Sequence, residues 1–138
     1  MRRMSAIIKD QEPLILSPSA TVKHACQCMR ERRVGAVLVT ETEAHLVGIF
    51  TGRDAVWRVL AEGRDPGKTR LSEVMTRDPD TISPGRTTID ALRIMQDGGY
   101  RHLPIVADDK VMGIASRGDF KGLELERLEE ETGLWERI

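Results

Sequence analysis

The sequence predicts an α/β protein made of two tandem β-α-β-β-α repeats that pack with pseudo-two-fold symmetry. The first observation behind this prediction is a phrase that occurs twice, "GIFTGRD" at residues 48–54 and "GIASRGD" at residues 113–119. The second is that residues in the stretch 17–29 have matching residues in the stretch 83–95, always 66 positions later. The third is that both halves carry their helical and extended patterns in the same order. Such internal self-similarity is the signature of a repeat architecture.

The spacing between the two copies changes only where a loop can absorb one residue. Ser5 and Ser72 lie 67 residues apart, whereas Gly48 and Gly113 lie 65 residues apart. Because chains tolerate insertions and deletions mainly in surface loops, this pattern indicates a true duplication.

Each copy contains the same elements in the same order. A short helical start leads to an extended piece that ends in Ser-Pro, since proline pushes the preceding residue towards extended geometry. Apolar residues four apart, such as Ala25 and Met29, then predict a helix. Two apolar strands and a second helix follow. The expected helices span 20–33 and 54–63 in the first copy and 87–99 and 118–131 in the second, and the expected strand pairs span 34–39 with 46–50 and 102–106 with 111–115.

One unit of about 60 residues buries little surface alone, so we expect the two copies to complete each other's core. The predicted domains are repeat 1 at residues 4–63, a linker at 64–70, repeat 2 at 71–128 and a C-terminal extension at 129–138. The linker is rich in glycine, proline and charge. Leu134, Trp135 and Ile138 are apolar, which predicts that the extension docks on helices of this chain or of a neighbouring subunit.

Composition excludes several classes of function. The formal net charge of -1 provides no basic footprint for nucleic acid. No apolar run approaches the ~18–20 residues needed to span a bilayer, and the N-terminus lacks the apolar core of a secretory signal. We therefore expect a cytoplasmic protein without a membrane span.

The cysteines and histidines predict neither catalysis nor a metal site. Cys26 and Cys28 are two apart on a predicted helix, so they point about 200° away from each other and cannot form a disulfide. A metal site wants about four ligands, and only His24 lies near them. His24, His45 and His102 fall in a helix, a turn and a strand start, without a nucleophile or base that the repeats would bring close. We predict that the protein is not an enzyme and requires no cofactor.

The repeated phrase has two chemical interpretations. A hydroxyl residue followed three positions later by an acid resembles a capping box at a helix N-terminus. The same position can bind a nucleotide, because free amides there attract phosphate and a carboxylate can accept two hydrogen bonds from a ribose diol. The two interpretations are compatible, and the residues alone leave both open.

Taken together, the duplicated units resemble a tandem pair of CBS domains, or Bateman module, of the stand-alone bacterial type. The resemblance covers roughly Met4 to Leu128 and rests on "TVKHACQCMRERRVGAVLV" with "GIFTGRD" and on "TTIDALRIMQDGGYRHLPIV" with "GIASRGD". It implies a non-catalytic regulatory module that binds AMP, ADP, ATP or NAD in clefts between the repeats and signals to an effector protein in trans. The alternative is a dimerising scaffold whose nucleotide sites are degenerate.

The resemblance also implies roles for individual residues. Asp54 and Asp119 would hold ribose hydroxyls, and Thr51 and Ser116 would touch ribose or phosphate. The implied adenine contacts are Thr81 and the backbone near Val37 and Pro104, and the implied phosphate contacts are Arg32, Arg33 and Arg101.

The two clefts are expected to be unequal, with the Asp119 cleft the tighter. Ile15 stands in the first repeat where the second has Thr81, so one cleft lacks a hydroxyl for adenine. The arginines at 32–33 are expected to reach the Asp119 cleft from the opposite repeat, whereas glycines occupy the corresponding positions 98–99.

A homodimer is expected because the second helix of each repeat keeps apolar residues that a lone pair would expose, and a two-fold dimer covers them at low cost. These residues are Val56, Trp57, Val59 and Leu60 in the first repeat and Phe120, Leu123 and Leu125 in the second.

Overall fold

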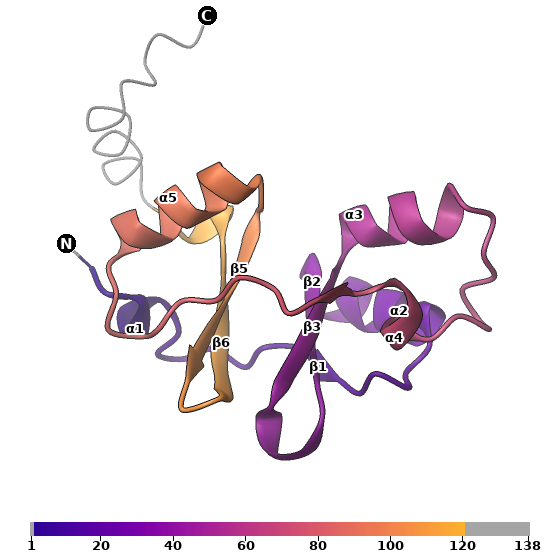
Figure 1. Cartoon of the computed structure of the whole chain (residues 1–138), viewed down its shortest axis with the longest axis horizontal. Helices are drawn as coiled ribbons and strands as arrows, with labels where there is room; N and C mark the ends of the chain where they lie inside the picture. The colour runs from indigo at the N-terminus through magenta and orange to yellow at the C-terminus, as the bar shows by residue number, and fades with distance from the viewer. Residues whose placement is uncertain (1, 121–138) are drawn as a thin grey trace, which may run out of the picture. The chain divides into compact units, whose positions relative to one another are not determined.

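The computed structural model describes residues 2–120, which belong to two compact units (Figure 1). The first-repeat unit contains residues 12–79 and 108–111. The described residues of the second-repeat unit are 2–11, 80–107 and 112–120. Within this described part of the chain, no helix is both long and apolar enough to cross a bilayer.

The first-repeat unit is built on a four-stranded sheet in the order β1-β2-β3-β4. Its strands are β1 (Ile15–Leu16), β2 (Ala36–Thr40), β3 (Leu46–Thr51) and β4 (Thr76–Arg77). Strand β1 runs parallel to β2, and the other neighbours are antiparallel, with Val37 opposite Phe50 in the central pair. The central strands match the pair expected from the sequence, whereas β4 was not expected.

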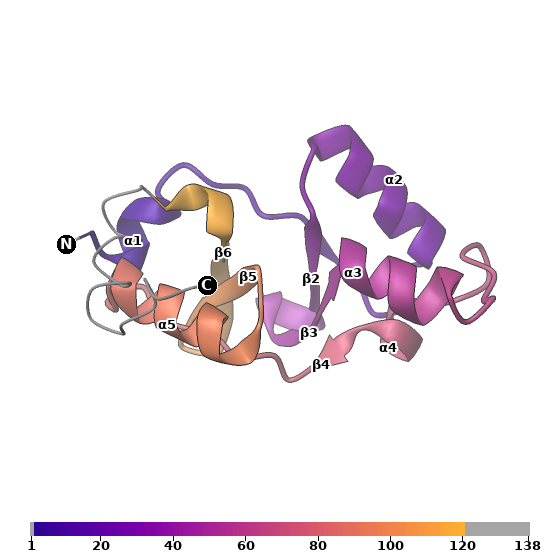
Figure 2. The ribbon, with the colours of Figure 1, turned by 90° about the horizontal axis from the view of Figure 1, so that it is seen from above.

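Three helical segments, α2, α3 and α4, cover one face of this sheet (Figure 2). Helix α2 (Val22–Arg32) begins at Thr21, whose hydroxyl accepts a hydrogen bond from the N–H of His24. It ends at Arg33, which adopts a left-handed conformation with φ of 54°. The buried face of the helix carries the apolar residues Val22, Ala25 and Met29. The helix expected at 20–33 is thus confirmed, and its caps explain both ends.

The helix after the first phrase starts as α3 (Gly52–Asp54) and continues as a π-helical segment, η2 (Ala55–Leu60). Its wider winding is seen in the hydrogen bond from the N–H of Ala61 to the carbonyl of Val56. Val59 is 1% exposed and belongs to the core. Its prediction as a surface residue is wrong, because its side chain packs inward in this winding. Helix α4 (Leu71–Val74) and the short turn η1 (Thr42–Ala44) complete the unit.

The second-repeat unit carries a strand pair, β5 (His102–Ala107) and β6 (Lys110–Ser116), although the first two residues of β6 are grouped with the first-repeat unit. Helices α1 (Met4–Ile7) and α5 (Thr88–Gly98) lie on one face of this pair (Figure 2). The extended piece that was expected before the second Ser-Pro is reduced to one parallel bridge between Ile82 and Ile105. The phrase at 113–119 ends in a short 3-10 turn, η3 (Arg117–Asp119).

Phe120 is 8% exposed and packs in the core of the second-repeat unit, so its prediction as an exposed helix residue is wrong. The other apolar residues named for the second helix and the C-terminal extension lie outside the described residues. These are Leu123, Leu125, Leu134, Trp135 and Ile138.

The two units exchange their opening helices. Helix α1 comes first in the chain, yet the N–H of Ser5 donates to the carbonyl of Pro84 at 2.9 Å in the second-repeat unit. Helix α4 opens the second copy, yet the N–H of Ser72 donates to the carbonyl of Pro18 at 3.0 Å in the first-repeat unit. The two contacts are equivalent, because Ser5 corresponds to Ser72 and Pro84 to Pro18. Each compact unit therefore contains a segment from the other copy of the sequence.

Candidate functional site

The first phrase ends in a hydrogen-bonded turn between β3 and α3. Oδ2 of Asp54 accepts hydrogen bonds from the backbone N–H of Thr51 at 3.0 Å and from its hydroxyl at 3.2 Å. The N–H of Asp54 donates in turn to Oγ1 of Thr51 at 3.3 Å. These bonds form a capping box, so the capping interpretation of the phrase is confirmed.

The second phrase repeats this geometry between β6 and η3. Oδ2 of Asp119 accepts hydrogen bonds from the N–H of Ser116 at 2.7 Å and from its hydroxyl at 3.3 Å. In both phrases a hydroxyl and a carboxylate are therefore held side by side at a strand end, where a helical turn begins. This is a pair that can offer a donor to a phosphate and acceptors to a diol.

The two carboxylates have different surroundings. Asp54 is 8% exposed, and its Oδ1 lies 3.5 Å from Nε of Arg58. The guanidinium of Arg58 also donates to the carbonyls of Val74 and Met75, at 3.3 and 3.0 Å, which holds it in place. Asp119 is half-buried rather than buried. The second carboxylate is therefore the more accessible of the two.

The glycine of each phrase lies where the packing leaves no room for a Cβ atom. A Cβ on Gly48 would lie 2.5 Å from Sδ of Met75, which follows helix α4. A Cβ on Gly113 would lie 2.5 Å from Cγ2 of Ile8, which follows helix α1. Because glycine has no side chain, the residue that follows each exchanged helix can pack directly against the strand at this position.

Each phrase lies beside the start of the neighbouring strand. The N–H of Gly52 donates to the carbonyl of Gly35, and the N–H of Arg117 donates to the carbonyl of Arg101, both at 3.1 Å. The backbones are equivalent, but the side chains are not. The second-repeat unit has Arg101 and His102 where the first has glycine and alanine. The strand beside the second phrase therefore begins with a cation and an imidazole, whereas the strand beside the first begins with two small apolar residues.

His102 is half-buried at the start of β5. Burial lowers the pKa of its imidazole, the positive charge of Arg101 lowers it further, and the carboxylate of Asp119 opposes both effects. The electrostatic influence of Asp119 places the imidazole in the neighbourhood of the second phrase.

The residues expected to contact adenine occupy equivalent edges in the two units. Thr81 is exposed and precedes Ile82, whose N–H donates to the carbonyl of Pro104 at 3.0 Å. Ile15 is 39% exposed and pairs with Leu38 on β2. The second site thus has the hydroxyl of Thr81 at the surface, where the first site has the apolar side chain of Ile15. The Val37 side chain is fully buried in the core, so only its backbone can contribute to a site.

The expected phosphate contacts Arg32 and Arg33 lie at the end of α2 in the first-repeat unit, and both are exposed. A guanidinium nitrogen of Arg32 donates to the backbone carbonyl of Glu12 in the same unit. Positive charge at a helix C-terminus also complements the helix dipole. These contacts supply a structural role for both arginines.

A model of one protein family matches the chain twice. The CBS domain model covers residues 5–60 and again residues 71–125. The chain belongs to the CBS domain family. The expectation drawn from the two phrases and the duplicated pattern is confirmed, and the chain contains two CBS repeats in tandem.

Relatives of this CBS pair occur in bacteria and in plants. CBS domain-containing protein YhcV of Bacillus subtilis is 38% identical over 104 residues, which are 75% of this chain and 73% of YhcV. CBS domain-containing protein CBSCBSPB2 of Arabidopsis thaliana is 43% identical over 101 residues, which are 73% of this chain. The matched region is only 19% of that plant protein, so the CBS pair spans about a fifth of it.

Solved CBS structures share the fold. The crystal structure of CBS domain NE2398 has a TM-score of 0.81 and 29% identity, and the match covers 92% of this chain and 98% of that one. CBS domain protein PAE2072 from Pyrobaculum aerophilum, described as complexed with AMP, has a TM-score of 0.82 and 22% identity over 93% of this chain and 98% of its own. A hexameric CBS-CP12 protein from bloom-forming cyanobacteria has a TM-score of 0.80 and 27% identity, over 96% and 76% of the two chains.

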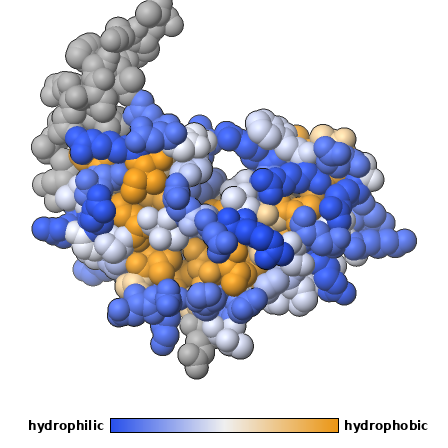
Figure 3. All heavy atoms as spheres, in the orientation of Figure 1, coloured by the Kyte–Doolittle hydropathy of each residue, from blue (hydrophilic) through white to orange (hydrophobic). Residues whose placement is uncertain are grey.

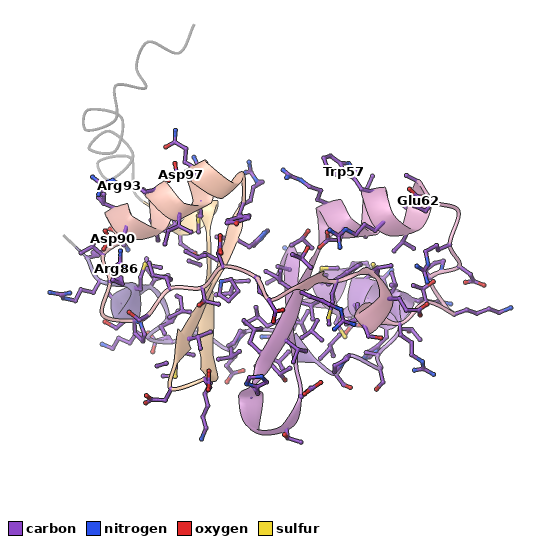
Figure 4. All side chains as sticks on the ribbon, in the orientation of Figure 1. Trp57, Glu62, Arg86, Asp90, Arg93 and Asp97 are labelled. Atoms are coloured by element: carbon purple, nitrogen blue, oxygen red, sulfur yellow. The ribbon has the colours of Figure 1, made fainter. Side chains whose placement is uncertain are left out.

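The CBS pair also exposes an apolar face beside the first phrase. Val56, Trp57 and Leu60 on η2 are 51%, 63% and 66% exposed, and apolar atoms reach the surface among charged ones (Figure 3). Figure 4 shows Trp57 on this helix and Glu62 just after its end, and the guanidinium of Arg53 lies 5.3 Å from the Trp57 ring centre. Beside the helix is a groove of about 490 Å³, lined by Trp57, Arg58, Glu62, Arg64, Glu73 and Val74.

Proposed function

We propose that this CBS pair is a non-catalytic regulatory module that binds an adenosine nucleotide, AMP, ADP, ATP or NAD, and signals to a partner protein in trans. One observation carries the proposal: in both phrases a hydroxyl and a carboxylate are hydrogen-bonded together at a strand end, at 3.2 and 3.3 Å. The AMP complex of PAE2072 supports the ligand class, since that protein has the same fold.

The geometry explains how a ribosyl phosphate would bind. The carboxylate oxygens accept hydrogen bonds from the two ribose hydroxyls, while the backbone N–H of the capping residue keeps the carboxylate in position. The Thr or Ser hydroxyl then rotates from the carboxylate to the ligand. A charged acceptor makes these bonds roughly twice as strong as neutral ones.

The second phrase is proposed as the principal site. Asp119 is more accessible than Asp54, whose Oδ1 already faces the guanidinium of Arg58 at 3.5 Å. Arg101 supplies positive charge for phosphate beside it, and Thr81 supplies a hydroxyl near the backbone of Pro104. At the first phrase the carboxylate is buried, Arg58 is already paired with it, and Ile15 stands in place of Thr81.

We further propose that the module acts as a homodimer. The exposed residues Val56, Trp57 and Leu60 form an apolar face that a second copy would cover. The hexameric CBS-CP12 protein supports self-association in this family.

The test is a set of thermal melts and calorimetric titrations with AMP, ATP and NAD. A ligand that binds only the folded protein stabilises it by about 2.7 kcal/mol at a concentration of a hundred times Kd.

We expect Asp119→Ala to abolish the tighter binding and Asp54→Ala to leave it largely intact. Asp90→Ala is the matched control, because Asp90 forms the same capping box with Thr87 outside either phrase. If Asp54→Ala is the more damaging variant, the ranking of the two sites is wrong.

A scaffold without nucleotide binding is the second candidate function. The observation in its favour is that each carboxylate already has partners within its own turn, and Asp54 has Arg58 as well. Melts that do not change with any of the three nucleotides, in a protein that still dimerises, would support the scaffold and reject the regulatory module.

A further inference from the structure

A histidine and a cysteine lie side by side on α2, away from both phrases. Nε2 of His24 is 3.6 Å from Sγ of Cys28. The residues are four apart, so their side chains project from the same face of the helix. His24 is exposed and Cys28 is half-buried, which leaves the imidazole open to solvent.

The separation of these two atoms suits neighbouring ligands of a tetrahedral metal ion. With a metal–sulfur bond of about 2.3 Å and a metal–nitrogen bond of about 2.05 Å, a tetrahedral angle places sulfur and nitrogen about 3.6 Å apart. A single ion can therefore contact both atoms while the helix keeps its present conformation. Thiolate and imidazole are ligands of zinc-class ions, whereas Mg²⁺ and Ca²⁺ prefer oxygen.

We propose that His24 and Cys28 form a two-donor chelate for Zn²⁺ and for similar ions such as Co²⁺. Within residues 2–120, no group of three or more His, Cys, Asp or Glu side chains could hold a metal ion. Water therefore fills the remaining positions, and the site is an open, exchangeable one rather than a closed structural one. Binding releases the thiol proton, because only the thiolate is a ligand.

Cys26 provides the internal contrast. Both cysteines pack against the core of the first-repeat unit, but Cys26 is two residues away from both His24 and Cys28, so its side chain projects from another side of the helix. The sequence alone predicted no metal site, because fewer than four ligands lie near the cysteines. The 3.6 Å separation between Nε2 of His24 and Sγ of Cys28 indicates a two-donor site that this criterion excludes.

The first experiment is a titration of the reduced full chain with Co²⁺, followed by absorbance. We expect a thiolate-to-cobalt charge-transfer band that added Zn²⁺ removes. Cys28→Ser and His24→Gln should lose the band, whereas Cys26→Ser and His45→Gln should keep it. Far-UV circular dichroism checks that each variant is folded. A wild-type protein without the band, or a band that depends on Cys26 instead, would overturn the proposal.

A second measurement does not depend on spectra. Iodoacetamide labelling with and without Zn²⁺, followed by mass spectrometry of the peptide, gives the alkylation rate of each cysteine separately. We expect Zn²⁺ to slow the labelling of Cys28 by at least about tenfold, since a bound thiolate is a poor nucleophile, and to leave Cys26 unchanged. In His24→Gln this protection should disappear. Equal protection of both cysteines, or protection that survives His24→Gln, contradicts the chelate.

Discussion

Gly48 and Met75 are in direct contact, although one belongs to the repeated phrase and the other follows the opening helix of the second copy. A Cβ on Gly48 would lie 2.5 Å from Sδ of Met75 and 3.0 Å from the carbonyl oxygen of Thr76. Gly113 has the equivalent relationship with Ile8. The repeated glycine is therefore required by the helix exchange itself, independently of any ligand.

Gly48→Ala should destabilise the protein by about 1–3 kcal/mol, because extra volume at a packed contact forces neighbours to move. Met75 is 4% exposed, so its side chain cannot simply turn into solvent. Chemical denaturation measures the effect. Gly52→Ala is the control, since nothing lies within 4 Å of its Cβ position. An equal loss in both variants would show that the contact with Met75 is not the cause.

Met4→Ala should lower the stability of the second-repeat unit, although Met4 belongs to the first repeat in the sequence. Met4 is fully buried and belongs to the same core as Leu92 and Ile105. Removing such a side chain costs about 2–5 kcal/mol. Hydrogen exchange should show weaker protection in α5 and β5. A loss centred on β2 and β3 instead would contradict the exchange of opening helices.

Asp90→Asn should weaken the pH dependence of stability in acid. A hydrogen bond from Arg86, followed by one from the backbone of Thr87, lowers the pKa of Asp90 from 3.8 to about 2; Figure 4 shows Arg86 and Asp90 at the start of α5. The folded state then holds the proton more weakly than the unfolded state. The stabilisation is complete above pH 3.8 and is lost as the pH falls towards 2.

At one pKa unit per about 1.4 kcal/mol, and with solvent screening at this partly exposed carboxylate, the contribution of Asp90 is at most about 2 kcal/mol. Urea melts between pH 5 and about 2 measure it. The Asn variant should lose stability less steeply than the wild type over this interval. Parallel curves would show that Asp90 does not contribute to the acid sensitivity.

His102→Gln should reduce the pH dependence of stability near neutrality. Burial lowers the pKa of His102 below 6.5, so the unfolded state binds the proton first as the pH falls. The free energy of unfolding of the wild type should therefore decrease when the pH falls below 6.5, and stay level above it. Denaturant melts on both sides of that pH compare the two proteins. His45→Gln is the reference variant and should keep the pH dependence of the wild type. If His102→Gln keeps it as well, His102 is not the group responsible.

Leu60→Glu should convert a dimer to a monomer without unfolding it. Leu60 is 66% exposed, so a charge there costs little in the isolated chain but is strongly unfavourable in an apolar interface. Light scattering at micromolar concentration gives the mass. Met112→Glu is the control, because Met112 is an exposed apolar residue (47%) on β6. A wild-type chain with a monomer mass would reject the dimer.

Local patterns were sufficient for much of the fold. The four-residue spacing of Ala25 and Met29 predicted α2, because side-chain periodicity acts within a few residues. The two phrases predicted their capping boxes for the same reason. The family was predicted from the resemblance of the two phrases and their flanking segments to tandem CBS domains, which needs no tertiary information.

The placement of individual side chains was harder to predict. Val59 and Trp57 are two apart on an apolar helix, so they face opposite sides of it. Only the packing of the helix in the first-repeat unit decides that Val59 is buried and Trp57 exposed. The four-residue spacing of His24 and Cys28 places them on one face of the helix. The 3.6 Å separation of Nε2 and Sγ depends on their side-chain rotamers, which the spacing does not specify. The asymmetry of the two carboxylates depends on Arg58, whose orientation is set by the carbonyls of Val74 and Met75.

The sequence by itself determined that this protein has two copies of one β-α-β-β-α pattern, each ending its strand pair with a hydroxyl and a carboxylate in one turn. Only the tertiary structure decided that each opening helix completes the other unit. The reason is that Ser5 and Ser72 are equivalent in sequence, and each could bond to the proline of either copy. The choice of Pro84 for Ser5 and Pro18 for Ser72 is made by contacts between segments far apart in the chain, which no local pattern encodes.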